Sequence, residues 1–131
     1  KYIKSYLLLF SILSLFFCVC FGLLADVILT LFDASFVQYK TSFIILILGV
    51  SGILIFRGLF GNLLSSIGKA HINFYITSVA LFINLIGNYY LIPKFGIKGA
   101  AITSASIMWI TGTASALLFW KFYNRHFLSK K

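Results

Sequence analysis

Acidic residues are nearly absent from this sequence of 131 residues. It has no glutamate and only two aspartates, Asp26 and Asp33, and neither lies within an uncharged apolar run. No residues stand in a pattern typical of a nucleophile with its base, of a phosphate-binding glycine loop or of a zinc site. We therefore expect a protein that is not an enzyme and that has no cofactor and no metal site.

Cysteine is also scarce, and its spacing excludes the usual roles. Cys18 and Cys20 are the only two, and both lie in the first apolar run. Side chains two positions apart on a helix point to different sides, so a shared metal or an intrahelical disulfide is not expected. We expect both to fill space as small apolar residues.

Long hydrophobic runs make up most of the chain, which is 61% hydrophobic and 10% charged. This balance is far from that of soluble domains and indicates an integral membrane protein. Four runs reach the ~20 residues that cross a bilayer as an α-helix, and short connections favour up-and-down packing. The sequence predicts one all-α transmembrane region over residues 1–131, with helices at 5–31, 42–66, 72–92 and 99–123.

The net charge of +9 comes from basic residues that lie mostly between the apolar runs. This distribution indicates membrane topology rather than binding to nucleic acid, because loops rich in lysine and arginine stay in the cytoplasm. The termini and the second loop carry seven basic residues and the other side carries three, so we expect cytoplasmic termini. The seven are Lys1, Lys4, Lys69, Lys121, Arg125, Lys130 and Lys131, and the three are Lys40, Lys94 and Lys98.

Arg57 is the one charged residue well inside an apolar run. It lies four residues past the centre of the predicted helix 42–66, about 6 Å to the cytoplasmic side of the midplane. An arginine at a helix centre costs roughly 2.5–3.5 kcal/mol on insertion scales, so it is expected to face a cavity or a partner. In a cavity, its guanidinium would favour an anion such as a phosphate. The alternative is a side chain that snorkels to the inner headgroups, and the sequence leaves both open.

One side of the predicted helix 72–92 is polar and small. Asn84 and Asn88 on this side are suited to hydrogen-bonding a sugar or lining a wet pathway. The alternative is that they hydrogen-bond to a neighbouring helix, and this is the more common role of asparagine in a membrane helix. We take Arg57, Asn84 and Asn88 as the candidate cavity-lining or substrate-binding residues. The residues of this side are Asn73, Thr77, Ala80, Asn84, Gly87 and Asn88.

The predicted helix 99–123 carries small residues along one face. Helices in lipid associate mainly by close packing, so this face is expected to be a packing surface first and a substrate surface second. Gly58 and Gly61 on helix 42–66 are expected to allow a similar approach. The small residues are Ala101, Ala105, Gly112 and Ala116.

Proline and glycine mark the two short turns. Pro93 is the only proline, and we expect it where a helix has just ended, since it has no backbone donor. Gly96 is expected to take a positive φ in the connection, and Gly99 to let the next helix pack closely from its start. Gly68 stands where a helix C-terminal cap is expected.

The order of these features resembles the C-terminal part of bacterial polysaccharide-export flippases. These form the Wzx-like branch of the superfamily that also holds the MATE drug exporters and the lipid II flippases. The resemblance covers the whole chain, with the last four or so helices of a family that has twelve to fourteen. It rests on Gly68-Lys69, on Asn84 and Asn88, on Leu91-Ile92-Pro93, on Gly96 and on Gly99-Ala100-Ala101.

The resemblance implies a flippase in the bacterial inner membrane, in which two helical bundles face a central cavity and open alternately to each side. The four helices would be part of one bundle. The implied substrate is an oligosaccharide repeat unit on undecaprenyl diphosphate, used for O-antigen and other surface polysaccharides. Membrane lipids, a polysaccharide polymerase and other assembly proteins are the implied partners. No motif of the family covers Arg57, whose assignment rests on the physical argument above.

Two other functions remain open. One is a cation-coupled multidrug exporter of the MATE type, which calls for membrane-embedded carboxylates that these spans lack. The other is a self-standing four-helix membrane protein with a structural role. The chain begins with Lys1, so we expect a piece of a longer protein, the alternative being an omitted initiator methionine.

Overall fold

A computed structural model describes residues 2–127 of the chain, all of them in helices or short turns. Four helical segments are long and apolar enough to cross a membrane, at Tyr2–Leu23, Ala34–Ser66, Ala70–Phe95 and Ile97–Arg125. This confirms the prediction of an all-α membrane protein with four spans. The elements, in chain order, are α1 (Tyr2–Leu23), α2 (Ala25–Phe32), the 3-10 helix η1 (Ala34–Tyr39), α3 (Lys40–Gly52), the π-helix η2 (Ile53–Arg57), α4 (Gly58–Ser66), α5 (Ala70–Phe95) and α6 (Ile97–Phe127).

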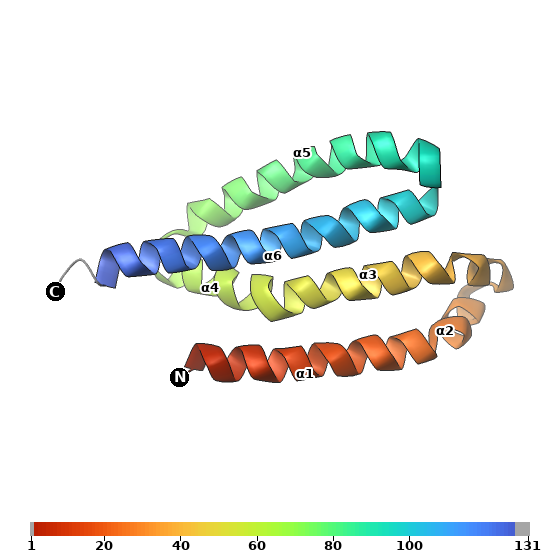
Figure 1. The fold of residues 1–131 in the computed structure, drawn as a ribbon, viewed down its shortest axis with the longest axis horizontal. Helices are drawn as coiled ribbons and strands as arrows, with labels where there is room; N and C mark the ends of the chain where they lie inside the picture. The colour runs from red at the N-terminus through yellow and green to blue at the C-terminus, as the bar shows by residue number, and fades with distance from the viewer. Residues whose placement is uncertain (1, 128–131) are drawn as a thin grey trace.

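The spans run alternately up and down, but their order in space differs from their order in the chain. The last helix, α6, lies between α3 and α5, and α1 packs on the other side of α3 (Figure 1). Both ends of the described chain lie at the same end of the molecule, beside the turn that joins α4 to α5 (Figure 1). The helix α6 is therefore the central element, with neighbours on both sides.

The first span is not the single helix predicted over residues 5–31. It begins at Tyr2 and breaks at Leu24, whose φ of −89° and ψ of 4° depart from α-helical values. Leu24 itself stays hydrogen-bonded at the break, since its N–H donates to Cys20 O and its carbonyl accepts from Ile28 N. The chain thus changes direction into α2, and hydropathy alone does not detect such a bend.

A short polar connection follows α2. Asp33 caps η1, since its Oδ1 accepts the Ser35 backbone N–H at 2.7 Å. The hydrogen bonds from Ser35 to the charged carboxylate lower the pKa of Asp33. Nearby, Lys40 Nζ and Asp26 Oδ2 form an exposed ion pair at 2.6 Å. Both acids of the chain therefore lie at the end of the molecule away from the termini.

The α4–α5 turn follows the predicted glycine chemistry. Gly68 has a φ of +73°, and its N–H donates to Ser65 O while the Lys69 N–H donates to Leu64 O. This pair of bonds is the Schellman motif, in which a left-handed residue satisfies the last carbonyls of a helix. The expected cap at Gly68 is confirmed.

The α5–α6 turn is only partly as predicted. Gly96 has a φ of +58°, which confirms its positive φ, but Pro93 lies inside α5, which continues to Phe95. The placement of Pro93 after the helix end was therefore wrong. In the last turn a proline forfeits one hydrogen bond, to the carbonyl four residues earlier, and Gly96 N still donates to Ile92 O at 2.7 Å. A Cβ at Gly99 would collide with the Leu91 carbonyl, so this glycine permits the tight hairpin.

Two glycines of α3, with Gly112 of α6, allow these two helices to approach closely. A Cβ at Gly49 would lie 2.6 Å from Ala105 Cα, and one at Gly52 would lie 3.0 Å from Trp109 Cα. The small face of α6 is thus a packing surface, as predicted. The close approach expected at Gly58 and Gly61 is not found. A Cβ at Gly58 would lie 3.4 Å from Tyr6 Oη and 3.7 Å from Ile53 O, and one at Gly61 would lie 3.6 Å from Asn73, all ordinary contacts.

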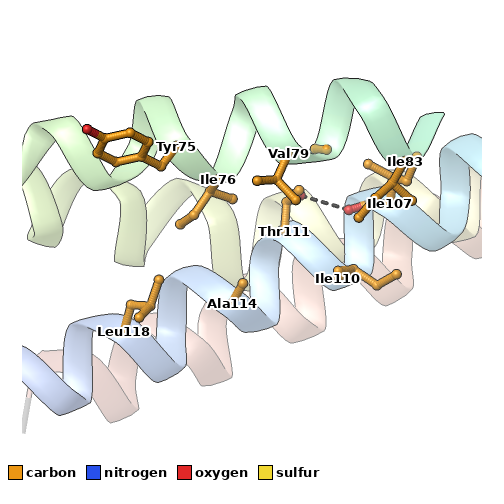
Figure 2. A pocket seen from close by; sticks show the side chains of 10 residues that line it. Tyr75, Ile76, Val79, Ile83, Ile107, Ile110, Thr111, Ala114 and Leu118 are labelled. Carbon is orange, nitrogen blue, oxygen red and sulfur yellow. Dashed lines mark hydrogen bonds between the residues drawn. The ribbon is translucent and has the colours of Figure 1, made fainter. Parts of the chain in front are cut away.

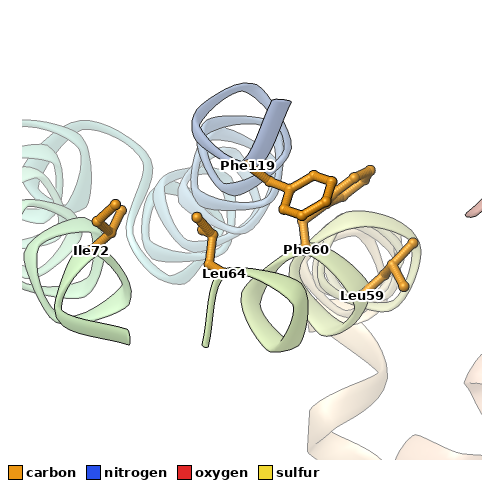
Figure 3. Packing of buried hydrophobic residues seen from close by; sticks show 5 residues of the cluster. All are labelled: Leu59, Phe60, Leu64, Ile72 and Phe119. Carbon is orange, nitrogen blue, oxygen red and sulfur yellow. The ribbon is translucent and has the colours of Figure 1, made fainter. Parts of the chain in front are cut away.

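The buried apolar core is small and lies near the termini. Phe60 of α4 and Phe119 of α6 place their rings 5.6 Å apart at its centre (Figure 3). Most other large apolar side chains are exposed on the outside of the helices, where a membrane supplies an apolar solvent. The core residues are Leu59, Phe60, Leu64, Ile72 and Phe119.

Candidate functional site

The candidate site is built around Arg57, the last residue of a π-helical turn. Hydrogen bonds in this turn span five residues, as from Gly58 N to Ile53 O. Single π-helical turns inside α-helices are rare and frequently lie at functional sites. Gly52 and Gly58 flank the turn. Arg57 therefore lies where the second span changes its winding, between α3 and α4.

Three helices meet at the guanidinium. Its Nη1 donates to Ser115 Oγ of α6 at 2.9 Å, and its Nη2 donates to Thr77 Oγ1 of α5 at 2.8 Å. Each hydroxyl donates a hydrogen bond to the carbonyl four residues earlier. Thr77 Oγ1 donates to Asn73 O at 2.8 Å, and Ser115 Oγ donates to Thr111 O at 2.9 Å. Both hydroxyls therefore act toward Arg57 as acceptors with their protons already engaged.

The hydrogen bonds hold the guanidinium at depth in the span. Arg57 lies nine residues before Ser66, about 13 Å along the helix from its end, and Thr77 lies seven residues after Ala70, about 10 Å from the start of α5. The side chain is half-buried. Its hydrogen bonds direct the Arg57 side chain toward α5 and α6 at this depth in the span.

No carboxylate compensates the charge of Arg57. The chain has two acids, and both lie at the far end of the molecule, where Asp26 is paired with Lys40. The partners of Arg57 are neutral hydroxyls, which satisfy donors but leave a net positive charge. A half-buried cation of this kind attracts an anion, and the planar guanidinium suits the oxygens of a phosphate.

Asn73 continues the polar contacts toward the α4–α5 turn. Its Nδ2 donates to Gly61 O at 2.8 Å and to Ser65 Oγ at 3.2 Å, which ties α5 to α4. Its Oδ1 is buried and has no hydrogen-bond partner among the described residues. Asn73 thus serves the packing of α5 against α4.

Asn84 and Asn88 do not join the Arg57 cluster. Asn88 Nδ2 donates to Asn84 Oδ1 at 2.5 Å, along the same helix, and within residues 2–127 neither bonds a neighbouring helix. Asn84 is seven residues from Thr77, about 10 Å along α5. The partners of Arg57 are thus Thr77 and Ser115, and not Asn84 or Asn88. Asn88 Oδ1 is buried without a partner in the described part of the chain, which leaves an acceptor unused.

Sequence reasoning missed Ser115. It lies among the small residues of α6, and no pattern distinguishes it from the other serines and threonines there. Only the placement of α6 beside η2 shows that its hydroxyl faces Arg57.

An apolar pocket of about 280 Å³ lies between α5 and α6. Figure 2 shows aliphatic side chains of both helices around it, and the Thr111 hydroxyl in its wall already donates to Ile107 O at 2.8 Å. It presents no charged side chain, so it offers nothing to an anion. Within residues 2–127 no three histidine, cysteine or acidic residues group as metal ligands, and Cys18 and Cys20 are free thiols.

Two curated proteins are similar to the chain. The capsular polysaccharide biosynthesis protein CapF of Staphylococcus aureus is 35% identical over 92 residues, which are 69% of this chain and 22% of CapF. The uncharacterised membrane protein MJ1068 of Methanocaldococcus jannaschii is 47% identical over 60 residues, which are 44% of this chain and 12% of that protein. No protein-family model and no solved structure matches the chain. The chain covers less than a quarter of the length of these two relatives. With its four spans, it is a multi-pass membrane protein that is similar to part of a polysaccharide biosynthesis protein.

Proposed function

We propose that the chain belongs to a non-enzymatic flippase of the Wzx-like type. The flippase would move lipid-linked oligosaccharide repeat units across the bacterial inner membrane for surface polysaccharide synthesis, by alternating access. The four spans would form part of one of its two bundles, with the termini of this segment in the cytoplasm. Arg57 carries the proposal, because it is a membrane-embedded cation held by hydroxyls of two other helices and by no carboxylate.

The charge of Arg57 agrees with the proposed substrate. A diphosphate linked to a lipid must cross the hydrocarbon, where an unpaired charge is costly. A guanidinium at this depth offsets part of that cost and binds phosphate oxygens in a bidentate manner. A cationic drug would be repelled at the same position, which disfavours a multidrug exporter. The similarity to CapF supports the same function, since its name links that protein to capsular polysaccharide.

The test replaces Arg57 in the full-length protein, in a strain that lacks the native copy. Arg57→Gln removes the charge but keeps groups that can bond Thr77 and Ser115. We expect surface polysaccharide to fall by about tenfold or more, since hydrogen bonds to charged groups contribute ~1.5–3 kcal/mol. The lipid-linked repeat unit should accumulate in the inner leaflet, with unchanged protein abundance in the membrane.

Two control variants separate charge at this site from other effects. Arg57→Lys keeps the charge and should retain part of the export. Lys98→Gln removes one charge from the exposed start of α6 and should export normally. Normal export by Arg57→Gln would show that Arg57 has no role in transport, and resistance to cationic drugs without polysaccharide export would favour the multidrug exporter.

A further inference from the structure

A second basic site lies at the end of the molecule that carries the termini. A pocket of about 330 Å³ opens there between the α4–α5 turn and the last turns of α6. It combines two cationic side chains with apolar ones. Its lining residues are Ile67, Gly68, Lys69, Phe122 and Arg125.

The fold brings both cations to this pocket. Lys69 directly follows Gly68 in the Schellman turn, and its Nζ lies 5.5 Å from the centre of the Phe122 ring, within cation–π range. Arg125 lies three residues after Phe122, so both project from nearly the same side of α6. The α4–α5 turn and the α6 end, which are distant in sequence, thus bring two positive charges together.

No acid of the chain neutralises these charges. Asp26 and Asp33 both lie at the opposite end of the molecule. Lys121 adds a further exposed positive charge on α6. The pocket is therefore a concave surface of unbalanced positive charge, and an anion is the ligand that its charge selects.

The position of the pocket indicates which anion it meets. Trp120 and Tyr123 flank Phe122 on α6, with their rings 6.0 Å apart, and such aromatic residues typically mark the level of the lipid headgroups. Basic pockets between transmembrane helices at this level bind anionic lipid headgroups. We propose that the pocket of Lys69, Phe122 and Arg125 binds the phosphate of an anionic lipid, with Ile67 and Phe122 against its glycerol and upper chain. This site is independent of Arg57 and of the function proposed above.

The test measures lipid binding to the purified full-length protein in neutral detergent. The probes are dioctanoyl phosphatidylglycerol, dioctanoyl phosphatidylcholine and inorganic phosphate, each titrated and followed by native mass spectrometry and by thermal shift. We expect the wild-type protein to bind phosphatidylglycerol in preference to the other two. Each cation near the membrane surface contributes about fivefold, so Lys69→Gln/Arg125→Gln should weaken this binding about 25-fold.

The control removes the same number of charges elsewhere. Lys94→Gln/Lys98→Gln alters two exposed lysines at the other end of the molecule and should leave the affinity within about twofold of wild type. Lys69→Arg should retain binding and shows that the turn still folds. Equal loss in both double variants would reduce the effect to net charge, and equal binding of inorganic phosphate would identify a free anion site. Unchanged affinity in Lys69→Gln/Arg125→Gln would also overturn the proposal.

Discussion

Replacing Gly112 by alanine tests the contact between α6 and the second span, Ala34–Ser66. A Cβ at this position would lie 2.7 Å from Gly52 O and 3.1 Å from Phe56 Cβ. The first of these is a backbone atom inside a continuous helix, so it cannot turn aside as a flexible side chain can. To regain an ordinary contact of 3.4 Å, the two helices must separate by about 0.7 Å at this point.

This separation has a cost that can be measured. Overpacking of a close contact typically costs about 1–3 kcal/mol, which is roughly a 5- to 150-fold change in the unfolding equilibrium. The free energy of unfolding is obtained by titrating the protein in mixed micelles with a denaturing detergent. Trp109 lies at the contact that Gly112→Ala perturbs. Its ring lies 6.0 Å from that of Phe56, and its Nε1 donates to Leu48 O at 2.9 Å.

Gly22→Ala is the matched control, since it makes the same chemical change with no atom within 4 Å of the new Cβ. In a helix, glycine to alanine is otherwise neutral or stabilising by about 0.5–1 kcal/mol. We therefore expect Gly112→Ala to lower the free energy of unfolding, and Gly22→Ala to leave it unchanged or raise it. Equal stability of the Gly112→Ala and wild-type proteins would refute the close contact and with it the position of α6.

Two further predictions concern single hydrogen bonds. Trp109→Phe keeps the aromatic packing but loses the bond to Leu48 O, and should lower the free energy of unfolding by about 0.5–1.5 kcal/mol, measured by circular dichroism. The pKa of Asp33 is lowered in the folded protein by its bond from Ser35, so the contribution of this cap is present above the usual aspartate pKa of about 3.9 and is lost as the pH falls through the lower folded value. In NMR the Ser35 amide should titrate with a midpoint below 3.9, and Asp33→Asn should abolish that titration; a midpoint at or above 3.9 would contradict the cap.

The spans and one turn could be predicted because they depend on short-range properties. Hydrophobic length predicts a helix without any tertiary information, and the cap of α4 uses only local bonds, from Gly68 N to Ser65 O and from Lys69 N to Leu64 O. Pro93 was misplaced because proline in the last helical turn forfeits only one bond, and the sequence does not show how far the helix continues. The bend at Leu24 has no proline or unusual hydropathy to mark it.

The contacts between spans could not be predicted, because they depend on which helices are neighbours. Gly49 and Gly52 are no different in the sequence from Gly58 and Gly61, and only the placement of α6 against α3 separates the two pairs. For the same reason, Arg57 could be identified from its charge in an apolar run, whereas Ser115 could not. That Asn84 and Asn88 lie apart from Arg57 likewise depends on which residue of α5 meets Arg57, and the structure shows this to be Thr77.

The turn Ile53–Arg57 is π-helical, with a hydrogen bond from Gly58 N to Ile53 O that spans five residues in place of four, so the turn holds one residue more than an α-helix would. An extra residue in a regular α-helix would rotate everything after it by about 100°. Here the π-helical turn absorbs that rotation, and the helix before it keeps Gly49 against α6 while the helix after it keeps Phe60 in the core. The second span therefore consists of two α-helices that face their neighbours independently of each other, and we expect a one-residue insertion or deletion to be tolerated best within this turn.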